Sequence, residues 1–335
     1  MKRNMRAWKD EVIASPVKKA IPILSFPSVQ LMGISVKDLI ADSKTQAKAM
    51  KLLTERNDSL AAVSMMDLSV EAEAFGAEIQ TSDDEVPVVI GALVKTQEDA
   101  DNLRVPKVGE ARTQIYIDAM KEAVELIQDR PVLAGVIGPF SLLGRLMGMA
   151  PAFKACKKNP ELVHTVMEKI TLFLMDFCDA YKATGAHGIC MAEPLTGLLA
   201  PKMAVEFSEP YVRRIIEHVQ SDAFAVIYHN CGNNALLMYD SLLRLGANGI
   251  HLGNAISMEE AVKGCPADVL CMGNVDPAIF TFGASENIYK QTQSILEACC
   301  SYPNFVISSG CDIPPIASWE NIDAFYQAAA DFYAK

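Results

Sequence analysis

Eight short apolar runs alternate along the chain with longer segments of helical pattern, and most runs end at glycine, proline or a polar residue. Strands that are continuously apolar and alternate with helices are typical of a parallel sheet buried on both faces. The runs are Ile21 to Phe26, Ala61 to Leu68, Val132 to Ile137, Gly188 to Ala192, Phe224 to Tyr228, Gly249 to Leu252, Val269 to Met272 and Phe305 to Ile307. They predict an α/β fold, a (β/α)8 TIM barrel, with residues 1–335 as a single domain.

A doubly wound open sheet is the alternative architecture. It would place a glycine-rich phosphate-binding loop after an early strand. The nearest candidate, Gly135 to Gly138, lacks the third glycine of that motif and is followed by Pro139. The sequence therefore favours the barrel.

Two segments add to the predicted barrel. Residues 1–14 are expected to form an N-terminal helix on the barrel exterior. Residues 69–129, between the second and third runs, are an insertion that we expect to cover the barrel mouth as a lid. Within it, Val88 to Ile90 and Ala92 to Val94 predict a small hairpin around Gly91.

Charge and apolar patterning exclude several classes of partner. The formal net charge of −11 argues against nucleic acid or an anionic membrane surface, because both require a basic face. The most apolar stretch, Val132 to Phe153, contains Arg145, two prolines and four glycines, and is a poor membrane span. No signal peptide is expected, and nine scattered cysteines favour a reducing cytoplasm.

Reactive side chains gather where the predicted strands end. Active sites of these barrels lie at the carboxyl ends of the strands, so such residues are expected at one rim. They are Asp67, Glu193, His229, Cys231, His251, Asn274, Asp276 and Cys311.

Three of these residues predict a metal site. His229 and Cys231 are two positions apart at a strand end, so their side chains can point to the same face. Cys311 lies in the turn after the last strand. One imidazole and two thiolates suit zinc and leave a fourth position open for a substrate. The alternative is two buried cysteines and one hydrogen-bonded histidine, and His251 is expected to be a hydrogen-bonded strand-end histidine rather than a ligand.

Four further rim residues are candidates for other roles. Glu193 could be a fourth ligand or a hydrogen-bond acceptor that orients His229, and a capping carboxylate is the alternative. Asp67 could hold substrate or take a proton, and a structural hydrogen bond is its alternative. Asn274 and Asp276 are candidates for cofactor binding in the seventh loop.

Five segments of the chain stand out together, Asp67 to Ala77, Gly138 to Phe140, Met191 to Pro194, Gly273 to Pro277 and Gly310 to Pro315. They resemble the uroporphyrinogen decarboxylase superfamily, and the resemblance covers the range from about Ile21 to Phe325. Within that resemblance, His229, Cys231 and Cys311 match the H-x-C…C zinc motif of the methylcobamide methyltransferase branch.

The resemblance implies a zinc-dependent methyltransferase. Members of that branch move a methyl group from a methylated corrinoid (methylcobamide) to a thiol such as coenzyme M, and relatives use tetrahydrofolate. The chain has no corrinoid-binding D-x-H-x-x-G segment, so the resemblance implies a separate corrinoid carrier protein as partner. A homodimer is among the expected assemblies.

Two alternatives stay open beside this interpretation. A uroporphyrinogen decarboxylase needs clustered arginines for its carboxylate-rich substrate. The resemblance implies that the decarboxylase branch carries a segment of the type Arg-Gln-Ala-Gly-Arg after its first strand. The matching stretch here, Ser25 to Gly33, has no basic residue, which disfavours a decarboxylase-like lyase. The other alternative is a barrel without catalysis that only binds a corrinoid protein.

Overall fold

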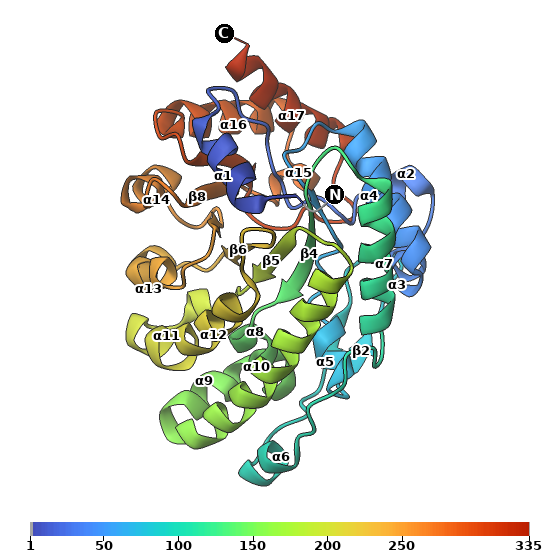
Figure 1. Ribbon diagram of the computed structural model, residues 1–335, viewed down its shortest axis with the longest axis vertical. Helices are drawn as coiled ribbons and strands as arrows, with labels where there is room; N and C mark the ends of the chain where they lie inside the picture. The colour runs from blue at the N-terminus through green and yellow to red at the C-terminus, as the bar shows by residue number, and fades with distance from the viewer. Residues whose placement is uncertain (1–2, 335) are drawn as a thin grey trace.

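A seven-stranded parallel sheet forms the centre of the molecule, in the order β1-β4-β5-β6-β7-β8-β9. The computed structural model describes residues 3–334. Figure 1 shows the sheet curling, with helices around its outer side. The strands are β1 (Ala62–Val63), β4 (Val132–Ile137), β5 (Gly188–Ala192), β6 (Ala225–Asn230), β7 (Gly249–Leu252), β8 (Leu270–Val275) and β9 (Phe305–Ser309). The predicted α/β class with a curled parallel sheet is confirmed.

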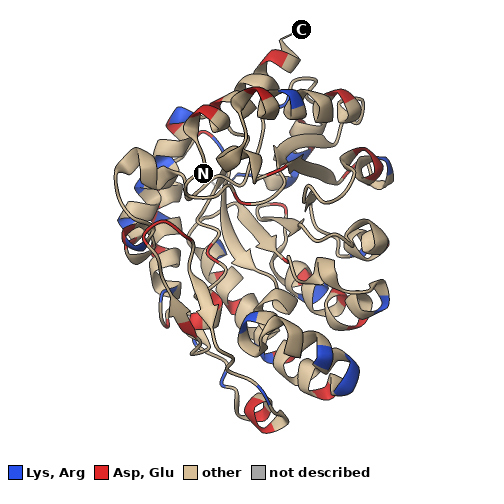
Figure 2. Cartoon of the chain, turned by 180° about the vertical axis from the view of Figure 1, so that it is seen from behind, with Lys and Arg blue, Asp and Glu red and all other residues tan. Residues whose placement is uncertain are grey.

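The helices that cover the outer face follow the strands in chain order, as a parallel sheet requires. Among the described residues they are α2 (Ser28–Met32), α3 (Val36–Ala41), α4 (Ser43–Arg56), α7 (Thr113–Leu126), α8 (Pro139–Met147), α9 (Met149–Lys158), α10 (Pro160–Ala183), α11 (Pro201–Phe207), α12 (Glu209–Val219), α13 (Tyr239–Arg244), α14 (Met258–Gly264), α15 (Ile279–Phe282), α16 (Ser285–Cys299) and α17 (Trp319–Tyr333). No described helix is both long enough and apolar enough to cross a membrane. In the view of Figure 2, acidic and basic residues are mixed along these helices.

The first expected strand, residues 21–26, is not a strand of the sheet. The segment still lies between the two edge strands, because the Ile21 amide donates to the Ile307 carbonyl at 3.1 Å and the Leu60 amide donates to the Ala20 carbonyl at 2.8 Å. Pro22 has no amide hydrogen, and the Ile23 amide donates to the Ser309 hydroxyl instead of a backbone carbonyl. The prediction of eight strands was therefore wrong by one: the segment bridges β9 and the chain before β1 without a regular ladder.

The N-terminal helix closes one end of the sheet. Helix α1 (Met5–Ala14) begins at Asn4, whose side chain accepts from the Ala7 amide. Its buried Met5, Trp8 and Val12 pack in one cluster with side chains of the strand interior. The expectation that this helix lies on the barrel exterior was wrong, because its apolar face fills the amino-terminal end of the barrel.

The segment after β1 carries a small hairpin. It contains α5 (Val70–Ala74), β2 (Glu78–Gln80), β3 (Val88–Ile90) and α6 (Gln97–Asn102). Strand β3 pairs antiparallel with β2, so the predicted partner, Ala92 to Val94, was wrong. Helix α7 packs against α4 and β4 as one of the outer helices, and the added segment ends before it.

Side chains alternate between two cores along each strand. On β6, Ala225 and Ile227 belong to the cluster inside the barrel, and Val226 and Tyr228 belong to the cluster between sheet and helices. This period of two follows from strand geometry. It decides which residues at the strand ends face the barrel interior.

Candidate metal centre

Three side chains from distant parts of the chain meet at the carboxyl end of the sheet. His229 is on β6, Cys231 follows that strand directly, and Cys311 lies two residues after β9. One ligand atom of each residue lies within 4.8 Å of those of the other two. Because β7 and β8 separate β6 from β9 in the sheet, this contact crosses the barrel interior.

The spacing of the two sulfurs suits a shared ion. The Sγ atoms of Cys231 and Cys311 are 3.9 Å apart. Two sulfurs that each lie about 2.3 Å from one tetrahedral zinc are about 3.8 Å apart, whereas a disulfide needs about 2.05 Å. The Cys311 thiol donates to Cys231, and this hydrogen bond lowers the pKa of the Cys231 thiol.

The imidazole of His229 offers a buried nitrogen with no hydrogen-bond partner. His229 is 2% exposed, and its Nε2 atom has no partner among the described residues. A buried polar nitrogen left unpaired costs free energy, and a metal ion satisfies such an atom. The donor set and its geometry therefore fit zinc.

The other nitrogen of His229 belongs to a hydrogen-bond chain that fixes its tautomer. The Ser308 hydroxyl donates to the Ile21 carbonyl at 2.8 Å, so its oxygen can only accept from His251 Nε2, 2.6 Å away. Burial lowers the pKa of His251 well below its ordinary value, so the ring is neutral and its Nδ1 is an acceptor. His229 Nδ1 lies 2.7 Å from that atom and must donate, which leaves the His229 Nε2 lone pair free for a metal.

The contact between the two histidines follows from strand register. His229 and His251 are paired residues on the neighbouring parallel strands β6 and β7, so their side chains lie on the same face of the sheet. The sequence indicated only that His251 has a hydrogen-bond partner. Its position at the end of the strand after His229 was the available signal for a role in orienting the ligand.

We expect His251→Phe to lower zinc affinity by about 10- to 100-fold, because hydrogen-bond partners of metal-bound histidines contribute about this much. Competition with a chelating dye measures the affinity. Cys271→Ala, a buried cysteine on β8 outside the metal centre, is the control for a general loss of packing. An unchanged zinc affinity in His251→Phe would contradict the orienting role.

A cavity of about 160 Å³ lies over the three ligand residues. Its walls come from the strand ends, from α8 and from the loop that joins β2 to β3, which contributes Val86 and Pro87. The residues that line it are Ile23, Met66, Leu68, Val86, Pro87, Arg145, Ala192, Pro194, His229, Cys231, Cys311 and Asp312.

Asp67 does not line this cavity. Met66 and Leu68 do, whereas the Asp67 carboxylate points to Arg112 and Tyr116, at the start of α7. Its carboxylate is buried and accepts hydrogen bonds from Ser69, from Tyr116 at 2.8 Å and from Arg112. These contacts tie the end of β1 to α7.

Glu193 also faces away from the cavity, which Ala192 and Pro194 line. Its carboxylate is completely buried and accepts from the Ser141 amide at 2.9 Å and from the Thr196 hydroxyl. Burial raises the pKa of Glu193 to about 7. The residue that hydrogen-bonds the His229 ring is His251, so the structure does not support Glu193 in that role.

Asn274 and Asp276 hold the loop after β8. The Asn274 amide donates to the carbonyls of Gly253 and Ile256, at 2.9 and 3.0 Å. Asp276 accepts from the Ala278 amide at 2.9 Å. Neither lines the cavity, and their predicted role in cofactor binding stays a prediction.

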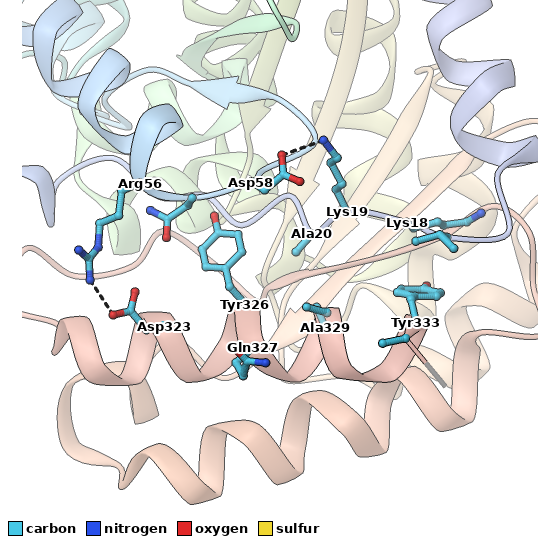
Figure 3. Close-up of a pocket in the computed structure, with 14 residues that line it drawn as sticks. Lys18, Lys19, Ala20, Arg56, Asp58, Asp323, Tyr326, Gln327, Ala329 and Tyr333 are labelled. Carbon is cyan, nitrogen blue, oxygen red and sulfur yellow. Dashed lines mark hydrogen bonds and ion pairs between the residues drawn. The ribbon is translucent and has the colours of Figure 1, made fainter.

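A larger cavity, of about 670 Å³, lies beside the amino-terminal end of β1, between α17 and residues 17–20. Figure 3 shows its charged groups paired across it, Lys19 with Asp58 at 2.7 Å and Arg56 with Asp323 at 2.6 Å. The cavity at the metal centre, although smaller, is the one that contains reactive groups.

Comparison with known proteins identifies one family, and the similar proteins below include members of two of its branches. A family model described as uroporphyrinogen decarboxylase (URO-D) matches residues 10–332. The chain is 26% identical over 273 residues to a methylcobamide:CoM methyltransferase MtbA of Methanosarcina acetivorans, which covers 79% of this chain and 78% of that protein. It is 27% identical over 280 residues to a uroporphyrinogen decarboxylase of Desulfotalea psychrophila, which covers 80% of each.

A solved structure shares the whole fold. A methyltransferase from Methanosarcina mazei superimposes with a TM-score of 0.86 over 98% of both chains, at 22% sequence identity. At this identity the similarity establishes the fold alone.

Proposed function

The chain belongs to the uroporphyrinogen decarboxylase family, and we propose that within this family it is a methyltransferase that moves a methyl group from a methylcobamide to a thiol. A curated relative with this activity in its name, the methylcobamide:CoM methyltransferase MtbA, supports the proposal. The observation that carries it is the convergence of His229, Cys231 and Cys311 beneath one cavity.

The residues of this centre have separate tasks. His229 offers a nitrogen lone pair fixed by His251, and Cys231 and Cys311 offer two sulfurs. A zinc ion held by these three ligands would bind the acceptor sulfur in its fourth position and keep it as a thiolate. The apolar walls of the cavity, such as Met66 and Leu68, exclude water from that sulfur.

The methyl donor must approach from the rim. In the transfer, the acceptor sulfur forms a bond to the methyl carbon while the cobalt–carbon bond breaks, and its electron pair remains on cobalt. A corrin is too large for a cavity of about 160 Å³, so it docks over the cavity rather than within it. Val86 and Pro87, in the loop between β2 and β3, line the cavity over which the corrin would dock. We propose that the β2–β3 hairpin acts as a lid.

The partner in this proposal is a corrinoid carrier protein that presents the methylcobamide at the rim. Exposed apolar side chains in the connections that follow β6, β8 and β9 support such a contact, and they are Leu237, Phe282 and Ile316. A homodimer and a cytoplasmic location remain part of the same proposal.

Decarboxylation of a carboxylate-rich tetrapyrrole fits this cavity less well. Such a substrate requires several cations. Arg145 is the one basic residue among those that line the cavity, and Asp312 brings an acidic group to the same wall. The charge of the cavity therefore favours methyl transfer.

Zinc content and methylcobalamin turnover test the proposal together. We expect one zinc per chain in protein purified without added metal, and a loss of most of it in Cys311→Ala. Wild-type protein should demethylate methylcobalamin with a thiol, followed at the visible corrin absorption bands. Coenzyme M, homocysteine and tetrahydrofolate are tried in turn.

Full zinc content in Cys311→Ala would remove Cys311 from the ligand set. Demethylation that requires tetrahydrofolate and persists with a chelator would assign the chain to folate-using relatives. No demethylation with any acceptor would contradict the proposed function.

A further inference from the structure

Two cysteines outside the metal centre form a second pair of thiols. Cys265 follows α14 directly, and Cys271 is on β8, against which α14 packs (Figure 1). The Cys271 sulfur lies 3.9 Å from the Tyr239 hydroxyl, which is also a hydrogen-bond partner of Cys265. That hydroxyl donates to the Ala261 carbonyl at 2.8 Å, so its oxygen accepts from the thiols. Both cysteines are free, and their side chains hydrogen-bond with each other.

The turn between the two cysteines is held in shape by its own backbone and by a buried side chain. The Val269 amide donates to the Pro266 carbonyl at 3.0 Å. The Asn304 side-chain amide donates to the carbonyls of Pro266 and Val269, at 3.0 and 2.9 Å. The Cys265 thiol donates to the Val269 carbonyl at 3.6 Å, which holds its sulfur against the turn that leads into β8. The approach of Cys265 to Cys271 is therefore built into the fold.

The two thiols differ in exposure and in acidity. Cys265 is partly exposed, whereas Cys271 is completely buried. The hydrogen bond with Cys271 lowers the pKa of the Cys265 thiol, and the same bond raises the pKa of Cys271. Because the thiolate is the reactive form of cysteine, the accessible member of the pair is also the better nucleophile. A reactive, accessible cysteine beside a second thiol is typical of sites that are oxidised reversibly.

We propose that Cys265 and Cys271 are a redox modification site, at which hydrogen peroxide or another hydroperoxide converts the two thiols to a disulfide. The Cys265 sulfur attacks a peroxide oxygen, the O–O bond breaks, and a sulfenic acid forms on Cys265. The Cys271 sulfur then attacks the Cys265 sulfur, so that the S–S bond forms while the S–O bond breaks. With hydrogen peroxide, both oxygens leave as water together with the two thiol protons. The thiols lose two electrons, and the peroxide gains them.

This site is separate from the metal centre and does not depend on the proposed function. Cys271 is near the amino-terminal end of β8, whereas His229, Cys231 and Cys311 lie at the carboxyl ends of their strands. Its side chain belongs to the layer between the sheet and the helices, not to the barrel interior. Oxidation of the pair should therefore leave the metal content of the protein unchanged.

Peptide mapping of the full-length protein tests the proposal. The protein is treated with a slight excess of hydrogen peroxide, free thiols are blocked with N-ethylmaleimide, and a tryptic digest is analysed by mass spectrometry without reduction. The tryptic peptide Gly264 to Lys290 contains Cys265 and Cys271 and no other cysteine. We expect this peptide to lose two hydrogen atoms and to take up no maleimide. Reduction before blocking should restore two maleimide groups.

Three variants assign the roles of the two sulfurs. Cys265→Ser changes the partly exposed position and should abolish the oxidation of this peptide. Cys271→Ser should stop the reaction at a sulfenic acid on Cys265, which dimedone traps. Cys300→Ser is the matched control, since Cys300 is an exposed cysteine at the end of α16, outside the pair. The disulfide should form in this variant as in wild type.

A peptide that still takes up two maleimide groups, while other cysteines of the protein are oxidised, would overturn the proposal. Disulfide formation that is lost in Cys300→Ser would overturn it as well, because the reactive thiol would then be Cys300. Loss of metal without a Cys265–Cys271 disulfide would place the oxidation at Cys231 and Cys311 instead. Absence of methylcobalamin demethylation would contradict the proposed function and leave this modification site unaffected.

Discussion

Replacing Cys231 with alanine is expected to lower the turnover of methylcobalamin with a thiol acceptor by about 100-fold or more, the scale of losing a key electrostatic contributor. The Sγ atoms of Cys231 and Cys311 are 3.9 Å apart. Replacing Cys231 leaves only His229 and Cys311, which are an incomplete ligand set. Free thiols have a pKa of about 8.5 and are mostly protonated at neutral pH. Without the third ligand the acceptor should return to that state.

Affinity for cobalamin should change little in the same variant, because the corrin lies over the rim and not within the cavity. Stopped-flow absorbance gives turnover, and equilibrium titration gives the binding constant. The wild-type rate should also depend less on pH, between about pH 6 and 9, than the reaction of the free thiol does.

Cys190→Ala is a suitable control, since Cys190 is a buried cysteine of the barrel interior outside the metal centre. Full activity of Cys231→Ala with thiol acceptors would remove the metal centre from the mechanism. A parallel loss of cobalamin binding and turnover would instead indicate a damaged fold.

Replacing Asp67 with alanine is expected to destabilise the protein by about 3 kcal/mol, the low end of the range for breaking a buried ion pair. The Asp67 side chain is completely buried, and the variant leaves the Tyr116 hydroxyl and one edge of the Arg112 guanidinium without an acceptor. Arg112 keeps its second partner, Glu73, at 2.6 Å, which limits the loss. Urea unfolding followed by circular dichroism measures the change.

Glu73→Gln provides the comparison, because this more exposed carboxylate shares Arg112 and should cost about 1 kcal/mol or less. Asp67→Asn keeps the shape of the side chain and separates structure from chemistry. A variant with wild-type stability and lost turnover would restore Asp67 as a catalytic residue, as the sequence indicated.

The sequence determined the class of fold and which three residues form the candidate metal centre. Alternating apolar runs and helical segments predicted a parallel sheet, and seven of the eight runs are strands of it. The spacing of His229 and Cys231 at a strand end, with Cys311 after the last strand, was sufficient because all carboxyl ends of a parallel sheet meet at one rim.

Only the tertiary structure decided which rim residues face the cavity. Glu193 lies between Ala192 and Pro194, which line the cavity, and faces away from it. Asp67 lies four residues after β1, and its hydrogen bonds with Arg112 and Tyr116 hold it toward α7. The position of a residue at the end of a strand shows where it lies along the barrel axis. The side of the sheet to which its side chain points depends on how the strand pairs with its neighbours.

Contacts across strands and helices were likewise outside the reach of a single sequence. His251 orients His229 because the two residues are paired across β6 and β7. Arg145 lines the same cavity from α8, the helix that follows β4. Local patterns specify which residues can form strands, helices and ligands, whereas partners far apart in the chain are chosen only when the packed elements bring them together.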